Sequence, residues 1–234
     1  MKRLLIIAIT LTTVLTLHAE DYLGFQLGFA RPISRLNAPK TNTILAPTPY
    51  NGFKLGLVYD ATLIKGFGMS MALNYTFAAN STDWKAVGSN KYPATRTQGQ
   101  YHTLEIPVEW QYKFEIAKQT YLLLYTGPTL QCGLSFANNK YFTNNGKDIS
   151  STIQQDLYSE IDMQDYALKR LNVTWGFGAG FQYDRYFIRG GYDLGIINPY
   201  KAYQFTEVVN GGNPRTRGRL DQWSIRLGMY LWQF

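Results

Sequence analysis

Apolar side chains occupy every second position in many segments of this chain, which is the spacing of a β-strand with one apolar face. In the segment 171–183, for example, Trp175 and Phe177 alternate with Thr174 and Gly176. Strands of about ten residues with this alternation are typical of membrane β-barrels. Eight segments show the pattern and are expected to be strands: 22–31, 50–60, 66–78, 101–114, 120–134, 171–183, 186–197 and 221–234.

Long and short connections alternate between these segments. The short connections are 61–65, 115–119 and 184–185, and the long ones are 32–49, 79–100, 135–170 and 198–220. Outer membrane barrels have short periplasmic turns and long extracellular loops, and they close because lipid offers no partner to an open sheet edge. The sequence therefore predicts an all-β fold, an eight-stranded antiparallel up-and-down transmembrane β-barrel with four long extracellular loops. Because the number of strands is even, both termini are expected in the periplasm.

The first residues have the layout of an export signal. Lys2 and Arg3 precede an apolar run over 4–17, and Ala19 is a small residue suited to cleavage. The run is too short to span a hydrocarbon core about 30 Å thick. We expect residues 1–19 to be a cleaved signal peptide and residues 20–234 to be a barrel domain in the cell outer membrane.

The composition agrees with a membrane barrel and excludes several other classes. Of the 234 residues, 17% are charged and 15% are aromatic, whereas a soluble domain has about 25% charged residues. The single cysteine excludes a disulfide framework and a thiolate metal cluster. A net charge of +7 suits nucleic acid only on a basic face of a soluble fold, so no nucleic-acid partner is expected. The sequence indicates no metal and no cofactor, because the glycine-rich run 176–180 lies in an alternating segment without a following helix.

Charged residues share the face opposite the apolar one, so we expect them inside the barrel. Buried ions are costly unless they are paired, and an eight-stranded barrel is just wide enough for side chains to fill it. This predicts an ionic plug, with Glu105 and Glu109 against Arg189 and Arg226, and disfavours a freely conducting pore. A selectivity filter or a proton path is the alternative. The full inward set is Lys54, Glu105, Glu109, Lys113, Arg189, Asp193 and Arg226.

Basic residues gather in the second and fourth long connections. A basic rim of this kind would bind lipopolysaccharide phosphates through charge-assisted hydrogen bonds. Ordinary solvated charge is an equally good interpretation. The residues concerned are Lys85, Lys91, Arg96, Arg215, Arg217 and Arg219.

The third long connection is acidic. Within 151–168, Ile153, Leu157 and Ile161 have helical spacing, which predicts a short surface helix. The carboxylates do not match a known calcium loop, and pairing with the basic fourth connection explains them at least as well. They are Asp148, Asp156, Glu160, Asp162 and Asp165.

Catalytic groups are scarce. Lipid-modifying barrels need a histidine with a serine or carboxylate at the outer rim. After cleavage of the signal peptide the remaining histidine is His102, for which Ser81 or Asp83 would be the partner. An interfacial, non-catalytic His102 is the simpler interpretation, and Cys132 is most simply a small apolar strand residue.

Several strings resemble the PorT-type outer membrane β-barrel proteins of Bacteroidota over nearly the whole mature chain. The resemblance implies an eight-stranded barrel that the barrel-assembly machinery inserts by reading the last strand, with Phe234 as the signal. The family's namesake is a component of a secretion apparatus, so the resemblance also implies secretion-system proteins as partners. The strings are LEIPV at 104–108, YTGP at 125–128, GFGAG at 176–180, RGGYDLG at 189–195 and the terminal Phe234.

The end of the last segment departs from that pattern. Phe234 shares parity with Trp232, Tyr230 and Gly228, which belong to the inward set. Either a bulge shifts the register or these rings cap the periplasmic mouth. For the whole chain we expect a non-enzymatic outer membrane barrel acting in surface binding, adhesion or secretion, in contact with membrane lipid and lipopolysaccharide. A narrow channel for small or hydrophobic solutes is the first alternative and a lipid-modifying enzyme the second.

Overall fold

The chain forms one antiparallel sheet that closes on itself. The computed structural model describes residues 20–37, 49–64, 66–83, 85–86, 94–144, 147–156, 158, 168–199 and 217–233. Within these ranges ten strands are present: β1 (Glu20–Asn37), β2 (Asn51–Ile64), β3 (Phe67–Ser81), β4 (Lys85–Ala86), β5 (Ala94–Ala117), β6 (Thr120–Asn144), β7 (Lys147–Asp156), β8 (Leu171–Tyr183), β9 (Tyr186–Gly195) and β10 (Arg217–Gln233).

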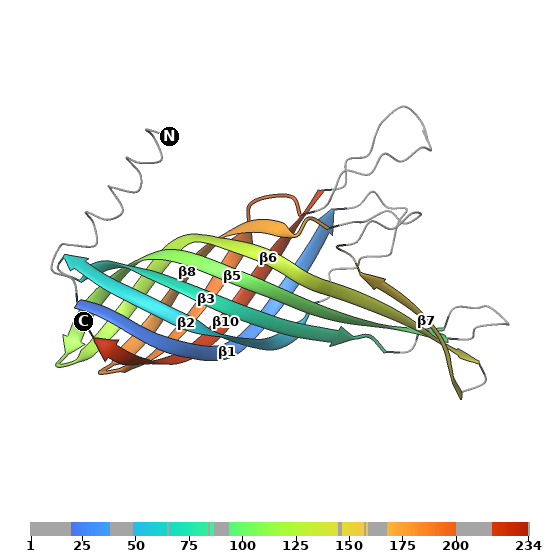
Figure 1. Ribbon diagram of the computed structural model, residues 1–234, viewed down its shortest axis with the longest axis horizontal. Coiled ribbons are helices and arrows are strands. Elements are labelled where there is room, and N and C mark those ends of the chain that lie inside the picture. The colour runs from blue at the N-terminus through green and yellow to red at the C-terminus, as the bar shows by residue number, and fades with distance from the viewer. Residues whose placement is uncertain are drawn as a thin grey trace, which may run out of the picture.

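Eight of the described strands make the ring, in the order β1, β2, β3, β5, β6, β8, β9 and β10, and each pairs with the next. The ring closes between the first and last strands, where Leu27 pairs with Leu227. Figure 1 shows this closure, with β1 in blue beside β10 in red. The eight-stranded antiparallel up-and-down barrel predicted from the sequence is confirmed.

The two faces of the barrel wall carry opposite kinds of side chain. On β2, Leu57 points outward with 59% of its surface exposed, whereas Lys54, Val58 and Asp60 are buried inside. The same alternation continues around the ring, because successive side chains of a strand lie on opposite faces. Among the described residues, no helix has the length and apolar character needed to cross a bilayer.

Both chain ends of the described barrel lie with its tight turns, at the left of Figure 1. We call this end the turn end, and the opposite end the loop end. The tight turns connect β2 to β3, β5 to β6 and β8 to β9. In the first of them Gly66 has φ of +84°, a conformation that residues with a Cβ rarely adopt. The expected alternation of short and long connections is therefore present.

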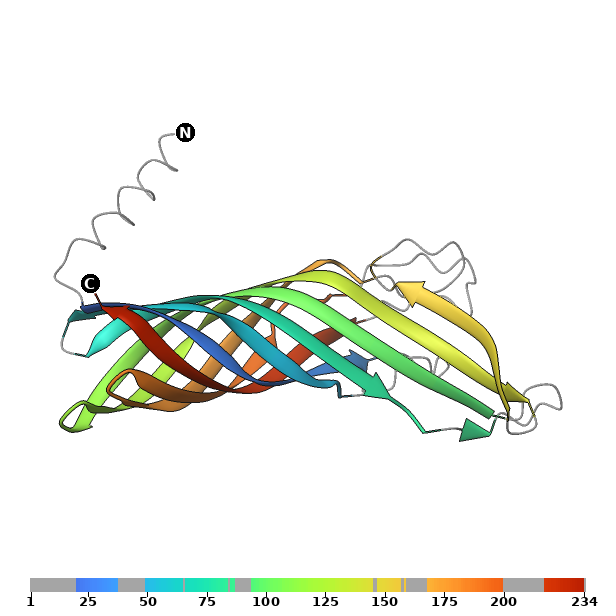
Figure 2. The same cartoon turned by 60° about the horizontal axis from the view of Figure 1, so that its bottom comes forward.

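The third long connection differs from the prediction. Instead of a helix over 151–168, residues 147–156 form β7, which pairs with β6 from Asn144 and Lys147 to Ala137 and Asp156. The reason is that β6 continues to Asn144 alongside β5 and offers β7 a ready sheet edge. Figures 1 and 2 show β5, β6 and β7 extending beyond the other barrel strands. The expected connection 79–100 is also shorter, because β5 begins at Ala94 and β4 pairs with it.

Candidate functional site

Polar and charged side chains fill the interior of the barrel, and they are the candidate functional site. We call the ion-paired part of this filling the lumen network. Its members come from β2, β5, β9 and β10, whose alternation turns every second residue inward. The lumen network comprises Lys54, Asp60, Glu105, Glu109, Lys113, Arg189, Arg226 and Tyr230.

Asp60 is the most heavily contacted carboxylate of the lumen network. Its Oδ2 atom lies 2.5 Å from Nη2 of Arg189 and accepts a hydrogen bond from the Tyr230 hydroxyl. The Lys113 ammonium lies 3.8 Å from the same oxygen. Asp60 and Arg189 are both completely buried. Since a buried ion is tolerated only with close partners, this pairing explains how both charges are accommodated.

Arg189 makes its remaining contacts with two other strands, β3 and β5, and with Phe187 on its own strand. Nη1 donates a hydrogen bond to Ser70 Oγ at 2.8 Å, and Nη2 donates to Gln111 Oε1 at 3.2 Å. Nη1 also lies 3.8 Å from a carboxylate oxygen of Glu109, and the guanidinium sits 4.8 Å above the Phe187 ring. One arginine therefore cross-links opposite walls of the barrel.

Glu109 and Arg226 form the second centre of the lumen network. Their Oε1 and Nη2 atoms are 3.2 Å apart, and the Arg226 guanidinium lies 5.4 Å from the centre of the Tyr125 ring. That ring fits because the two neighbouring strands, β8 and β9, carry glycine there. A Cβ added to Gly178 would lie 2.3 Å from a Tyr125 ring atom, and one added to Gly191 would lie 2.5 Å from its hydroxyl.

Lys54 and Glu105 form the third centre. The Lys54 Nζ atom lies 2.5 Å from Glu105 Oε2, and Thr76 donates a hydrogen bond to Oε1 at 2.8 Å. Gln222 donates to the same carboxylate at 3.2 and 3.3 Å. Glu105 is thus paired with a lysine and not, as expected, with Arg189 or Arg226. Asp193, the other predicted member, is half-buried and is not part of the ion pairs among the described residues.

Asp60 was missed by the sequence interpretation, and the facing of Tyr230 was left open. A signal for Asp60 was present, because it shares parity with Lys54 on one segment, whose predicted end fell at residue 60. Tyr230 was left undecided. The structure places a register shift next to it, since Gly24 pairs with Tyr230 but Leu23 pairs with Trp232. As a result Tyr230 points inward and Trp232 is exposed, so the bulge alternative is correct for these two residues.

Apolar clusters border the lumen network at both ends of the barrel. Towards the turn end, Val58, Ala72 and Phe187 pack with Tyr230. The other cluster, which we call the loop-end cluster, consists of Tyr50, Ala78, Tyr101, Phe136, Tyr158 and Leu168. Burial there raises the pKa of the Tyr158 hydroxyl. Packed rings at both ends and paired charges between them make a filled interior.

His102 lies in a ring cluster on the barrel wall. Its Nδ1 atom shares a hydrogen bond of 2.6 Å with the Tyr75 hydroxyl, and its ring centre is 4.8 Å from that of Phe77. These aromatic neighbours suit an interfacial residue. Cys132 is a free, half-buried thiol on β6.

The predicted basic rim is partly described. Arg219 is 44% exposed and pairs with Asp221 at 3.0 Å, and Arg35, opposite it on β1, reaches the same carboxylate at 2.7 Å. Arg35 was missed because it lies beyond the predicted strand 22–31. Arg96 lies 5.3 Å above the Tyr141 ring. Lys85 and Arg217 are placed on β4 and β10 by their backbone, whereas Lys91, Arg215 and Phe234 lie outside the described residues.

Residues 1–19, predicted as a signal peptide, also lie outside the described residues. Of the acidic residues of the third long connection, Asp148 and Asp156 lie on β7. Asp156 accepts a hydrogen bond of 3.0 Å from the Tyr158 amide, next to the loop-end cluster. Glu160, Asp162 and Asp165 are outside the described ranges.

Comparison with known proteins gives one family and several structural likenesses. A family model described as "Outer membrane protein beta-barrel domain" matches residues 15–200. A search of curated proteins gives no match. The crystal structure of Ail, the attachment invasion locus protein of Yersinia pestis, in complex with the heparin analogue sucrose octasulfate, has 10% identity and a TM-score of 0.40, covering 92% of this chain and 99% of Ail. Neisserial surface protein A has 13% identity and a TM-score of 0.39, covering 88% and 97%.

Proposed function

Because the chain belongs to the family of outer membrane protein β-barrel domains, we propose that it is a filled, non-enzymatic barrel that acts through its two ends. In this role the barrel anchors surfaces that bind partners, in surface binding, adhesion or as an accessory of secretion. The finer kinship with PorT-type proteins belongs to this proposal, as do the secretion partners it implies. The turn end and both termini face the periplasm, and the loop end faces outward.

The observation that carries the proposal is the completely buried ion pair of Asp60 and Arg189. A path for ions needs hydrated space, whereas these charges are already bound to each other and to Tyr230. Opening a path here would leave buried charges without partners, which costs roughly 3–5 kcal/mol for each broken pair. This supports a plug over the alternative of a narrow channel.

Conductance across planar bilayers tests the proposal. We expect the folded protein to give no steady current, and we expect Glu105→Ala and Arg226→Ala to open rare, unsteady conductance at most. Ile225→Ala, which changes an outward residue beside Arg226, is the matched control. A steady, ion-selective current in the unaltered protein, changed by either charge substitution but not by Ile225→Ala, would make the lumen network a transport path.

At the loop end we propose contact with lipopolysaccharide phosphates. Arg35 and Arg219 support it, because both are half-exposed and their shared partner Asp221 holds them side by side. Vesicles with and without lipopolysaccharide separate this contact from ordinary membrane insertion. The double substitution Arg35→Ala and Arg219→Ala should weaken lipopolysaccharide binding, and unchanged binding would remove these two residues from the proposal.

The enzyme alternative has little support. The enzyme interpretation needs Ser81 or Asp83 to position His102 as a general acid or base, whereas within the described residues the His102 ring shares its hydrogen bond with the Tyr75 hydroxyl. In a lipid-modification assay we expect the unaltered protein and His102→Ala to give the same background signal.

A further inference from the structure

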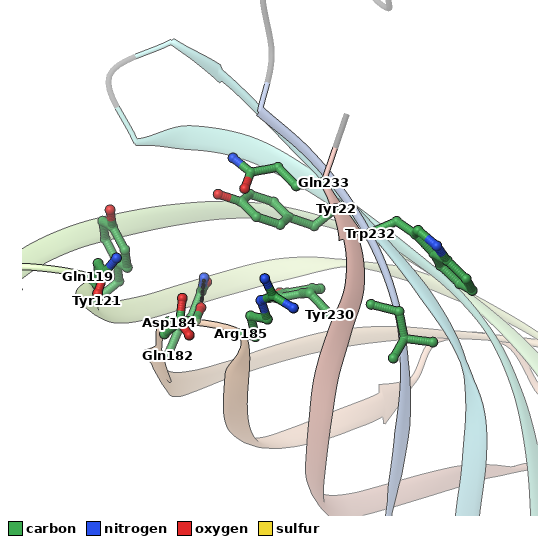
Figure 3. A pocket seen from close by; sticks show the side chains of 10 residues that line it. Tyr22, Gln119, Tyr121, Gln182, Asp184, Arg185, Tyr230, Trp232 and Gln233 are labelled. Atoms are coloured by element: carbon green, nitrogen blue, oxygen red, sulfur yellow. Dashed lines mark hydrogen bonds between the residues drawn. The ribbon is translucent and has the colours of Figure 1, made fainter.

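A small cavity opens at the turn end of the barrel, between two tight turns and the last residues of β10 (Figure 3). Its volume is about 280 Å³. Ligand pockets commonly measure roughly 300–1,000 Å³, so this cavity suits a small group, such as a single ring. The sequence interpretation considered a cap of aromatic rings here but assigned no ligand to the region.

Two tyrosine rings lie between the cavity and the ion pairs of the lumen network. The rings of Tyr22 and Tyr230 lie 5.0 Å apart and both line the cavity. On the barrel side, the Tyr230 hydroxyl bonds to Asp60 and to Arg189. The Lys113 ammonium lies 5.1 Å from the centre of the Tyr22 ring. The cavity therefore has a fixed aromatic floor.

Gln182 provides a polar group that has no partner in the described structure. Its side chain is only 3% exposed and lines the cavity. The amide nitrogen donates to the backbone oxygen of Asp184 at 3.1 Å, whereas the buried oxygen Oε1 has no hydrogen bond among the described residues. A buried acceptor without a donor costs about 1–3 kcal/mol. A ligand hydroxyl or amide in the cavity would supply the missing donor.

The backbone of the rim is held in place by the two turns. Gln119 and Asp184 have φ values of +59° and +51°, which are uncommon for residues other than glycine. The Asp184 amide donates to the Gln119 oxygen at 2.8 Å and so joins the turns. The Tyr230 amide donates to the Arg185 oxygen at 2.8 Å, which ties β10 to the same rim. The lining is thus organised before any ligand arrives.

The lining chemistry selects a neutral, polyhydroxylated ligand. Asp184 and Arg185 contribute one charge of each sign, so neither an anion nor a cation is favoured over the other. The remaining polar side chains are amides and tyrosine hydroxyls, which both donate and accept hydrogen bonds. Aromatic rings beside such groups match a sugar, which has an apolar ring face and hydroxyls at its edge. Tyr121, Leu231, Trp232 and Gln233 complete the lining.

We propose that this cavity binds one sugar ring of a neutral glycan. The proposal rests on the proposed function only for the location of the turn end, which there faces the periplasm and the glycans of the cell wall. An N-acetylated sugar fits best, because its acetamide N–H is a donor for the Gln182 oxygen. Binding at this site then attaches the barrel to the cell wall beneath it.

Titration calorimetry of the full-length folded protein tests the proposal, in a detergent without a sugar head group so that the detergent does not compete. The probe is N,N′-diacetylchitobiose. Cellobiose, which lacks the acetamide groups, shows how much they contribute to the affinity. We expect saturable binding in the millimolar range or tighter, and weaker binding of cellobiose. Gln182→Met removes the amide at similar size and should weaken binding about tenfold, the value of 1.4 kcal/mol. Gln131→Met, which removes another inward amide towards the loop end, should leave binding unchanged.

Three results would overturn the sugar site: absence of saturable binding, equal affinities of Gln182→Met and the unaltered protein, or binding of trialanine in place of both sugars. If Gln182→Met does not fold, Arg185→Ala takes its place, because that side chain is exposed on a turn. Weakened sugar binding by Arg185→Ala then supports the site, and unchanged binding counts against it. A barrel that conducts ions and still binds the sugar would refute the proposed plug and leave this site intact.

Discussion

The lumen network and the loop-end cluster fill the same barrel with opposite kinds of side chain. Asp60 and Arg189 meet as ions in the first, whereas Tyr101, Phe136 and Tyr158 pack as rings in the second. The outer face explains the difference. At the level of the lumen network the outward positions carry large apolar side chains such as Leu57. A strand that was apolar on both faces would aggregate before it reached the membrane, so the inner face is polar there and must be paired.

The largest expected effect comes from breaking the lumen network. Arg189→Ala leaves Asp60 and Glu109 buried without their arginine, so the free energy of unfolding should fall by roughly 3–5 kcal/mol. Urea unfolding of the protein refolded in lipid vesicles measures it. Ile188→Ala, at the neighbouring outward position, is the control and should cost much less. Equal losses for both variants would show that the ion pairs do not hold the walls together.

The second test moves along the outer face of β2. Leu57→Arg places a charge in lipid at the level of the lumen network and should destabilise the barrel by about 2–4 kcal/mol. Phe53→Arg lies nearer the loop end on the same strand and should cost only about 0–1 kcal/mol because the charge reaches the interface. Similar costs at both positions would contradict the idea that the two regions face different surroundings.

The third test weakens the loop-end cluster. Phe136 has its ring 5.3 Å from that of Tyr50, 5.4 Å from that of Tyr101 and 6.2 Å from that of Tyr158. Phe136→Leu keeps an apolar side chain but removes these ring pairs, and we expect a loss of about 1–2 kcal/mol. Unfolding in the same vesicles gives the value. A loss as large as that of Arg189→Ala would mean that rings and ions contribute equally.

The smallest effect is expected at the rim of the loop end. Arg219 is half-exposed, and the buried Asp221 keeps Arg35 as a partner when Arg219 is removed, so the expected loss is about 0–1 kcal/mol. Arg219→Ala should therefore leave the urea midpoint almost unchanged, and added salt should reduce any remaining difference because it screens exposed charges. A loss of several kcal/mol would place Arg219 in a buried network like that of Arg189.

Much of the barrel wall could be predicted from the sequence because lipid outside imposes a strict alternation on every strand. The same alternation turned Glu109 and Arg226 inward, and the structure brings them together. The partner of Glu105 could not be predicted, because contacts across the lumen depend on strand tilt and side-chain length. The alternation of residues along one strand gives no information on either. Lys54 in fact reaches it from β2.

The predictions were wrong or incomplete in regions where the alternation of apolar and polar residues carries no information. Helical spacing of Ile153 and Leu157 suggested a helix, yet β7 forms because β6 offers a sheet edge. The inward Tyr230 and outward Trp232 follow from one extra residue in the pairing of β10 with β1. The parity of Phe234 allowed a bulge but could not place it, since Tyr230 and Trp232 are both aromatic and suit either face.

The closure of the ring between β1 and β10 has a consequence for the order of folding. Tyr22 pairs with Gln233, so the contact that seals the wall joins residues at opposite ends of the described chain. Contacts of such long sequence separation carry a large entropic cost of loop closure and slow folding. The barrel therefore cannot be sealed until its last strand has been made. A circular permutant that joins the present termini and opens the turn at 184–185 would move this last step to the pairing of β8 with β9.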